Sequence, residues 1–158
     1  MSNLIGVFLG GMLAIVGGSI IKWMEYSMER RSLRAAIKAE ICGLLDLITR
    51  RGHGETFRKA IACWRADEDF DLHIFTLEED FTPVYRANIG KVGMLGADVA
   101  GDVVKFYDTI ISVRAELRAH INGLTRRMSP EARADQLEMV LDLWGEAMEL
   151  GADLTKRM

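Results

Sequence analysis

The sequence predicts an all-α protein in which a single N-terminal transmembrane helix extends into the cytoplasm and is followed by an irregular antiparallel helical bundle. Three observations lead to this fold class. Residues 4–21 contain no charged side chain, apolar residues recur at helical spacing along most of the remaining chain, and helix-start and helix-stop signals divide that remainder. We expect two parts, a transmembrane anchor at residues 1–24 and a cytoplasmic helical domain at residues 25–158.

The apolar segment at residues 4–21 is long enough to cross a bilayer. A helix of this length spans about 27 Å, which is close to the thickness of the hydrocarbon core. Trp23 and Tyr26 follow directly, and aromatic rings with a polar atom prefer the headgroup layer. Two alternatives stay open for this segment. Besides a membrane span, it could be a cleaved signal peptide, which would need a basic start and a small-x-small cleavage site, or a buried helix of a soluble protein.

Small residues recur at every fourth position of the apolar segment, at Gly6, Gly10, Ala14 and Gly18. In a helix this spacing places all four on nearly the same face, where a second helix can approach closely. We therefore expect this small-residue stripe to pack against other transmembrane helices. These belong either to further copies of the chain or to a larger complex.

The charges that follow the apolar segment predict its orientation. Residues 22–38 carry five basic and two acidic side chains, whereas no side-chain charge precedes residue 4. The positive-inside rule then places the N-terminus outside and the rest of the chain in the cytoplasm, with the helix in the bacterial inner membrane. The residues that we expect at the interface with membrane lipid are Lys22, Trp23, Tyr26, Arg30, Arg31 and Arg34.

Helical periodicity continues beyond the membrane segment. Apolar residues recur at steps of three and four from Leu33 to Ile48, and no proline separates them from the apolar segment, which predicts one helix over residues 3–50 ended at Gly52. Further helices are expected at residues 55–65, from residue 83 to a stop at residues 93–96, at residues 98–121 and at residues 130–154. Thr82 and Ser129, each followed by proline, are the expected N-caps. Apolar and polar side chains alternate only weakly over residues 70–77, and this segment is expected to form a loop.

An acidic segment between the second and third helices has the spacing of a calcium-binding loop. Asp67, Asp69, Asp71 and Glu78 occupy the first, third, fifth and twelfth positions. The sixth position of such a loop requires glycine for a sharp turn, and Leu72 occupies it here. We therefore predict no metal site and interpret the segment as a solvated connection, although cation binding between Asp67 and Glu78 stays open.

No catalytic residue and no cofactor are predicted. His53, His73 and His120 have no ligand partner at a recognisable spacing, so each is expected to be a surface or capping residue. Cys42 and Cys63 lie in apolar helical patterns and are expected to be reduced packing residues.

Charge and length narrow the remaining function classes. The net charge of −3 is distributed in alternating basic and acidic blocks, and no strongly basic domain indicates binding to nucleic acid. The chain after the anchor is long enough for one domain with a core of its own. Gly90, Gly93 and Gly96 follow no predicted strand, so they favour a helix break over a phosphate-binding loop.

The pattern at residues 81–88, 93–95 and 103–107, with Pro83, Tyr85 and the pair Phe106 and Tyr107, resembles that of uncharacterised bacterial and phage-borne small single-pass membrane proteins. The resemblance covers residues 81–107. It implies an N-terminal membrane helix and a helical cytoplasmic part, and it implies no activity. The chain departs from the pattern at Gly96, where such proteins often carry proline.

These observations together predict a non-enzymatic, membrane-anchored assembly or scaffold subunit. It would associate through its transmembrane helix and dock a cytoplasmic protein with its bundle. The alternative is a membrane-perturbing effector, in stress or phage defence, whose cytoplasmic part senses a signal.

Overall fold

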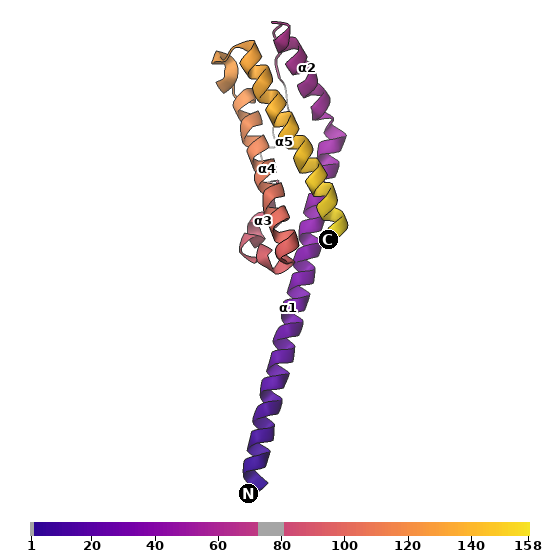
Figure 1. The fold of residues 1–158 in the computed structure, drawn as a ribbon, viewed down its shortest axis with the longest axis vertical. Coiled ribbons are helices and arrows are strands. Elements are labelled where there is room, and N and C mark those ends of the chain that lie inside the picture. The colour runs from indigo at the N-terminus through magenta and orange to yellow at the C-terminus, as the bar shows by residue number, and fades with distance from the viewer. Residues whose placement is uncertain (1, 73–80) are drawn as a thin grey trace.

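The computed structural model describes the backbone of residues 2–72 and 81–158, and the side chains of residues 16–72 and 81–158. Within these ranges the protein is all-helical, with no strand, which confirms the all-α part of the predicted fold class (Figure 1). In chain order the helices are α1 (Ser2–Arg51), α2 (His53–Arg65), α3 (Pro83–Asn88), the 3₁₀ helix η1 (Ile89–Leu95), α4 (Ala97–Ile121), the 3₁₀ helix η2 (Leu124–Arg127) and α5 (Pro130–Arg157).

Helix α1 is one continuous helix of 50 residues, as its uninterrupted periodicity predicted. At about 1.5 Å per residue it is about 75 Å long, and its N-terminal half projects away from the rest of the molecule (Figure 1). It ends where Gly52 adopts a left-handed conformation with φ of 61°, a turn that glycine makes without steric cost. Helix α2 then continues along the bundle in nearly the same direction.

Helix α5 is the central element of the bundle, since it packs against α1, α2 and α4. It runs antiparallel to all three, whereas α1 and α4 run in the same direction (Figure 1). The antiparallel arrangement predicted from the sequence therefore holds for α5 but not for α1 and α4. Helix α3 and η1 lie at the end of the bundle at which α1 enters, so α4 starts again from that end (Figure 1).

Two hydrophobic clusters form the core. The first joins α1, α3, η1, α4 and the C-terminal part of α5, and the second joins α2, the C-terminal part of α4 and the N-terminal part of α5. The largest fully buried side chains are Tyr107, Phe57, Phe106, Ile37, Ile41, Leu95, Leu137 and Leu154. The apolar stripe predicted for α1 supplies Leu33, Ile37, Ile41 and Leu44 to the first cluster.

The predicted helix starts differ in their outcome. Ser129 caps α5 as expected, because its side chain accepts a hydrogen bond of 3.2 Å from the backbone N–H of Ala132. The Thr82 side chain does not cap α3. The helix that starts at Pro83 is also shorter than predicted, since it changes to the 3₁₀ form after Asn88, where Gly90 and Gly93 weaken an α-helix.

Candidate functional site

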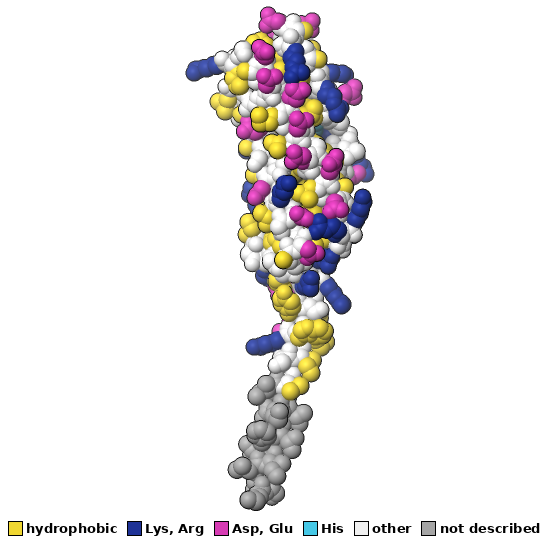
Figure 2. All heavy atoms as spheres, in the orientation of Figure 1, with side chains coloured by type: hydrophobic (Ala, Val, Ile, Leu, Met, Phe, Trp, Pro, Cys, Tyr) yellow, Lys and Arg dark blue, Asp and Glu magenta, His cyan; other side chains and the backbone are white. Residues whose placement is uncertain are grey.

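The part of α1 that projects beyond the bundle, residues 2–28, is called the stalk below. Its described side chains include a row of large apolar groups that are at least half exposed (Figure 2). They are Val16, Ile20, Ile21, Trp23, Met24, Tyr26 and Met28. The first buried residue of α1 is Leu33. Exposed apolar groups concentrated on one element outside the core mark a surface for interaction with a partner or a membrane.

The predicted membrane span lies in this stalk. Among the described residues, no helix contains an apolar stretch long enough to cross a membrane. The side chains of residues 4–15, which belong to the predicted span, lie outside the described residues. The structure thus supports the helical bundle of the predicted fold and gives no support to its transmembrane part.

The predicted small-residue stripe is described only at its C-terminal end. Gly6, Gly10 and Ala14 lie outside the described side chains. Gly18 is exposed, and a Cβ atom built on it would meet no atom within 4 Å. The neighbouring Gly17 has the same open surroundings. This end of the stripe is therefore accessible to a second helix.

The residues predicted at the membrane interface separate into two groups. Lys22, Trp23, Tyr26 and Arg31 are exposed on α1. Two further arginines contact the bundle: Arg30 Nη2 donates a hydrogen bond of 3.4 Å to the carbonyl oxygen of Leu95, and Arg34 donates to the carbonyl oxygen of Arg157. These two side chains fix α1 relative to the bundle, a role that the sequence did not indicate.

The end of the bundle from which the stalk leaves is formed by η1 and the start of α4, and it is called the base below (Figure 1). Val92 and Leu95 anchor η1 in the core, whereas Ile89 is 61% exposed. Lys91 Nζ lies 2.5 Å from Glu29 Oε1 of α1. The base is thereby held against the last residues of α1 before the bundle begins.

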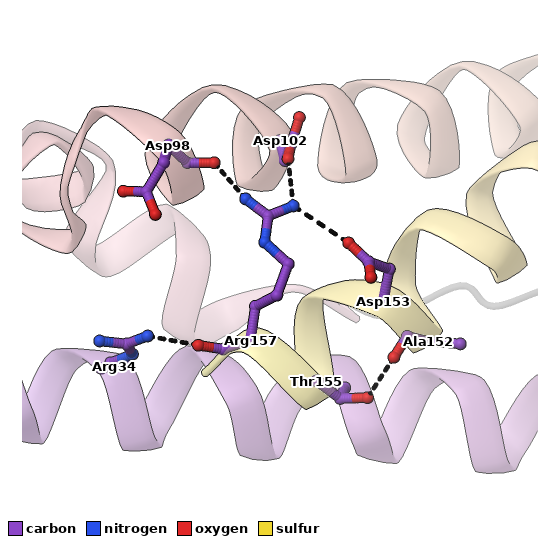
Figure 3. A network of polar contacts seen from close by, with 7 residues as sticks. All are labelled: Arg34, Asp98, Asp102, Ala152, Asp153, Thr155 and Arg157. Carbon is purple, nitrogen blue, oxygen red and sulfur yellow. Dashed lines mark hydrogen bonds and ion pairs between the residues drawn. The ribbon is translucent and has the colours of Figure 1, made fainter.

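A network around Arg157 connects three helices near the base (Figure 3). Arg157 Nη1 lies 2.6 Å from Asp102 Oδ2 of α4 and 3.0 Å from Asp153 Oδ2 of α5. Its Nη2 donates to the carbonyl oxygen of Asp98, while the Arg157 carbonyl accepts from Arg34 of α1. The C-terminal turn of α5 is therefore attached to both α1 and α4.

Glu40 of α1 organises the contact between α1 and α3. Its Oε1 accepts a hydrogen bond of 2.7 Å from the backbone N–H of Val84, and its Oε2 accepts one of 3.0 Å from that of Tyr85. The Tyr107 hydroxyl donates to the same Oε2 at 2.7 Å. Glu40 thus takes the capping role predicted for Thr82. The one signal in the sequence for this role of Glu40 is that its carboxylate lies directly beside Ile41 in a stripe that is otherwise apolar.

An open cavity of about 510 Å³ lies at the opposite end of the bundle, between α2, the end of α4 and the start of α5. His120 lines it, with Nδ1 3.2 Å from Thr125 Oγ1 and its ring stacked on Trp64. Only 8% of His120 is exposed, so it is not the surface residue that was one of the two roles predicted for it. Burial lowers the pKa of His120, with Arg133 acting in the same direction and Glu116 opposing it.

Two of the other candidate ligands, Asp69 and Asp71, line the same cavity as His120. Asp67, Asp69 and Asp71 are exposed, whereas Glu78 lies outside the described residues. Within the described ranges, no group of three or more His, Cys, Asp or Glu side chains could hold a metal ion. Both cysteines have free thiols, and Cys42 is exposed, so the prediction that it packs in the core is wrong.

Comparisons of the chain with protein-family models, with curated proteins and with solved structures found no match. Its function is therefore inferred from the stalk and the bundle themselves.

Proposed function

We propose that this chain is a non-enzymatic assembly or scaffold subunit, anchored in the bacterial inner membrane by its stalk and carrying a helical bundle that docks a protein partner in the cytoplasm. The observation that carries the proposal is the row of exposed apolar side chains from Val16 to Met28. Apolar surface left in water costs about 25 cal/mol per Å² relative to its burial. Lipid or a second helix would remove that cost.

The sequence around this row supports a membrane as the environment. Residues 4–21 carry no charge, and the helix that contains them is continuous into the bundle. Trp23 is 69% and Tyr26 is 50% exposed, so both rings are accessible to a headgroup layer at the end of the apolar segment. The basic residues that follow favour a cytoplasmic bundle by the positive-inside rule.

The small-residue stripe supports association of the stalk with another helix. Within lipid, helices associate mainly through close packing, and small residues permit the closest approach of two backbones. Gly18 is open to such an approach. Gly6, Gly10 and Ala14 continue the same face in an unbroken helix.

A surface for the protein partner is available on the bundle. Val104 and Ile111 lie seven residues apart, which places them on the same face of α4, and both are more than a third exposed. Met139 on α5 is 64% exposed, and a flexible methionine side chain suits an adaptable contact.

Larger side chains in the small-residue stripe test the proposed association of the stalk with another helix. The double substitution Gly10→Ile with Ala14→Ile keeps the segment apolar but holds a partner helix away, so we expect association to weaken by on the order of 1 kcal/mol. A membrane two-hybrid assay or energy transfer between labelled chains in vesicles measures this change. The matched control is Ser19→Ile, which adds the same side chain about 100° or more away from every residue of the stripe.

The outcomes separate the two parts of the proposal. If the double variant and Ser19→Ile associate as strongly as the unsubstituted chain, the stripe is not the interface. Extraction of membranes with alkaline carbonate tests the anchor itself. A chain that is released into the aqueous fraction without detergent contradicts membrane anchoring.

A further inference from the structure

We propose that the base of the bundle is a second membrane contact, in which η1 rests on the lipid headgroups and places Ile89 in the interfacial layer. This inference rests on the proposed anchor in the stalk. It assigns a surface of the bundle, distant in sequence from the stalk, to a bilayer surface that contains anionic lipid.

The height of the base above the membrane follows from the geometry of α1. Glu29 is the sixth residue after Trp23, which corresponds to a rise of about 9 Å along a helix. The polar layer on each side of the hydrocarbon core is about 5 to 7 Å thick. With Trp23 at the border of that core, Glu29 lies about 2 to 4 Å beyond this layer, so the base that it contacts faces the outer edge of the headgroups.

The base is held at this height by direct contacts. Lys91 of η1 forms its ion pair with Glu29 at 2.5 Å. One residue further along α1, Arg30 donates to the carbonyl oxygen of Leu95, the last residue of η1. A continuous helix with two such attachments gives the base a fixed position relative to the stalk.

The chemistry of the base fits an interfacial layer. Ile89 is 61% exposed although its neighbours Val92 and Leu95 are buried, so the bundle leaves this apolar side chain without cover. The exposed cations of α1 between the apolar segment and the bundle are Lys22, Arg30 and Arg31, and η1 adds Lys91. The acidic side chains nearby are Glu25, Asp98 and Glu29, and Glu29 is paired with Lys91. Exposed cations beside an apolar side chain are typical of surfaces that bind anionic headgroups.

Site-specific fluorescence in vesicles tests the contact with the full-length chain. In a background with Cys42→Ser and Cys63→Ala, a single cysteine is introduced by Val16→Cys, Ile89→Cys or Leu124→Cys and is labelled with an environment-sensitive dye. The vesicles contain phosphatidylethanolamine and phosphatidylglycerol, with a nitroxide quencher on a fraction of the headgroups or of the acyl chains. Leu124 is the matched control, because it is 71% exposed but lies in η2 at the opposite end of the bundle.

We expect acyl-chain nitroxides to quench the label at position 16 and headgroup nitroxides to quench the label at position 89, with no quenching at position 124. A second variant changes only the height of the base. Seven residues of strong helix formers inserted between Tyr26 and Ser27 lift the bundle by about 10 Å and nearly preserve its rotation. Quenching at position 89 should then be lost, while quenching at position 16 should persist.

The failures of the two proposals are distinguishable. If neither the headgroup nor the acyl-chain nitroxides quench the label at position 16, both the anchor and the second contact are wrong. If position 16 is quenched but position 89 behaves like position 124, the anchor stands and the second contact is overturned. Persistent quenching at position 89 after the insertion also overturns the inference, because the label would then reach lipid by another route.

Discussion

Glu40 and Tyr107 meet in a hydrogen bond of 2.7 Å between the carboxylate of α1 and the hydroxyl of α4. The same carboxylate accepts two backbone N–H groups at the start of α3, and the Tyr85 ring stacks on Tyr107 with centroids 3.9 Å apart. One side chain of α1 therefore satisfies donors from two other helices. Burial and this hydrogen bond raise the pKa of Tyr107 far above its ordinary value, so its hydroxyl remains a donor throughout the physiological range.

Replacement of this carboxylate should destabilise the fold strongly. Glu40→Ala leaves three donors without their acceptor, at about 1 to 3 kcal/mol for each donor that stays buried. We expect a loss of about 3 kcal/mol or more in the free energy of unfolding, measured by urea denaturation of the chain in detergent. Tyr107→Phe removes only one of the partners and should cost about 1 kcal/mol. Equal losses for the two variants would contradict the capping role of Glu40.

Position 151, where α5 comes close to its neighbours, should not tolerate a residue larger than glycine. A Cβ atom there would lie 2.7 Å from Phe106 Cε2 and 3.1 Å from Leu45 Cδ2, and Phe106 is fully buried. Gly151→Ala should therefore lower the free energy of unfolding by about 1 to 3 kcal/mol, since strain from overpacking exceeds the gain in helix propensity. Thermal unfolding followed by circular dichroism measures the change.

Gly145 provides the matched control on the same helix. A Cβ atom at this position meets nothing within 4 Å, so Gly145→Ala adds helix propensity without a clash. We expect stabilisation of up to about 1 kcal/mol. If both variants shift the unfolding temperature in the same direction, packing at Gly151 is not the cause.

Stability should decrease as the pH falls below about 6.5, in part because of His120. Its pKa is lowered in the folded state, mainly by burial, so the unfolded chain binds the proton more readily once the pH is below the ordinary pKa of histidine. The expected slope from this residue is at most about 1.4 kcal/mol per pH unit. His53, whose pKa is also lowered by burial and by Arg51, adds to the effect.

Two histidine variants show which residue causes this pH dependence of stability. The free energy of unfolding of His120→Gln, measured between pH 7.5 and pH 5.5, should depend less steeply on pH than that of the unsubstituted chain. His53→Gln removes the other contribution and leaves that of His120. An unchanged slope in His120→Gln would show that the ring is already accessible to protons in the folded state.

The Arg157 network should contribute stability that salt weakens. Arg157→Gln removes the contacts with Asp102 and Asp153, so its urea midpoint should be lower than that of the unsubstituted chain. These side chains are partly exposed, and the difference should therefore shrink at high ionic strength. Lys156→Gln is the control, since it removes the same charge one residue away. A midpoint shift that is as large for Lys156→Gln would indicate a general effect of charge.

Local signals in the sequence predicted much of the fold. The unbroken periodicity from Leu33 to Ile48 predicted the continuous α1, and the pair Ser129 and Pro130 predicted the start of α5 with its cap. These features depend on neighbours within a few residues. For that reason they can be read from the chain without knowledge of its tertiary contacts.

The features that the sequence did not predict depend on long-range contacts. Glu40 caps a helix that begins 43 residues later along the chain, and no local pattern indicates that pairing. The burial of His120 requires Trp64, which lies on a different helix. Arg30 and Arg34 match the composition of a membrane interface, but their contacts with Leu95 and Arg157 arise only when the bundle folds against α1.

The unbroken course of α1 has a consequence for any assembly of several copies. Helix α1 is unbroken from the stalk into the bundle. The face of the stalk that contacts a second stalk therefore also determines which faces of the two bundles are turned toward each other. A shift of that meeting face by one residue turns each bundle by about 100°. The choice of stripe along the stalk thus sets the symmetry with which neighbouring bundles present α4 and α5.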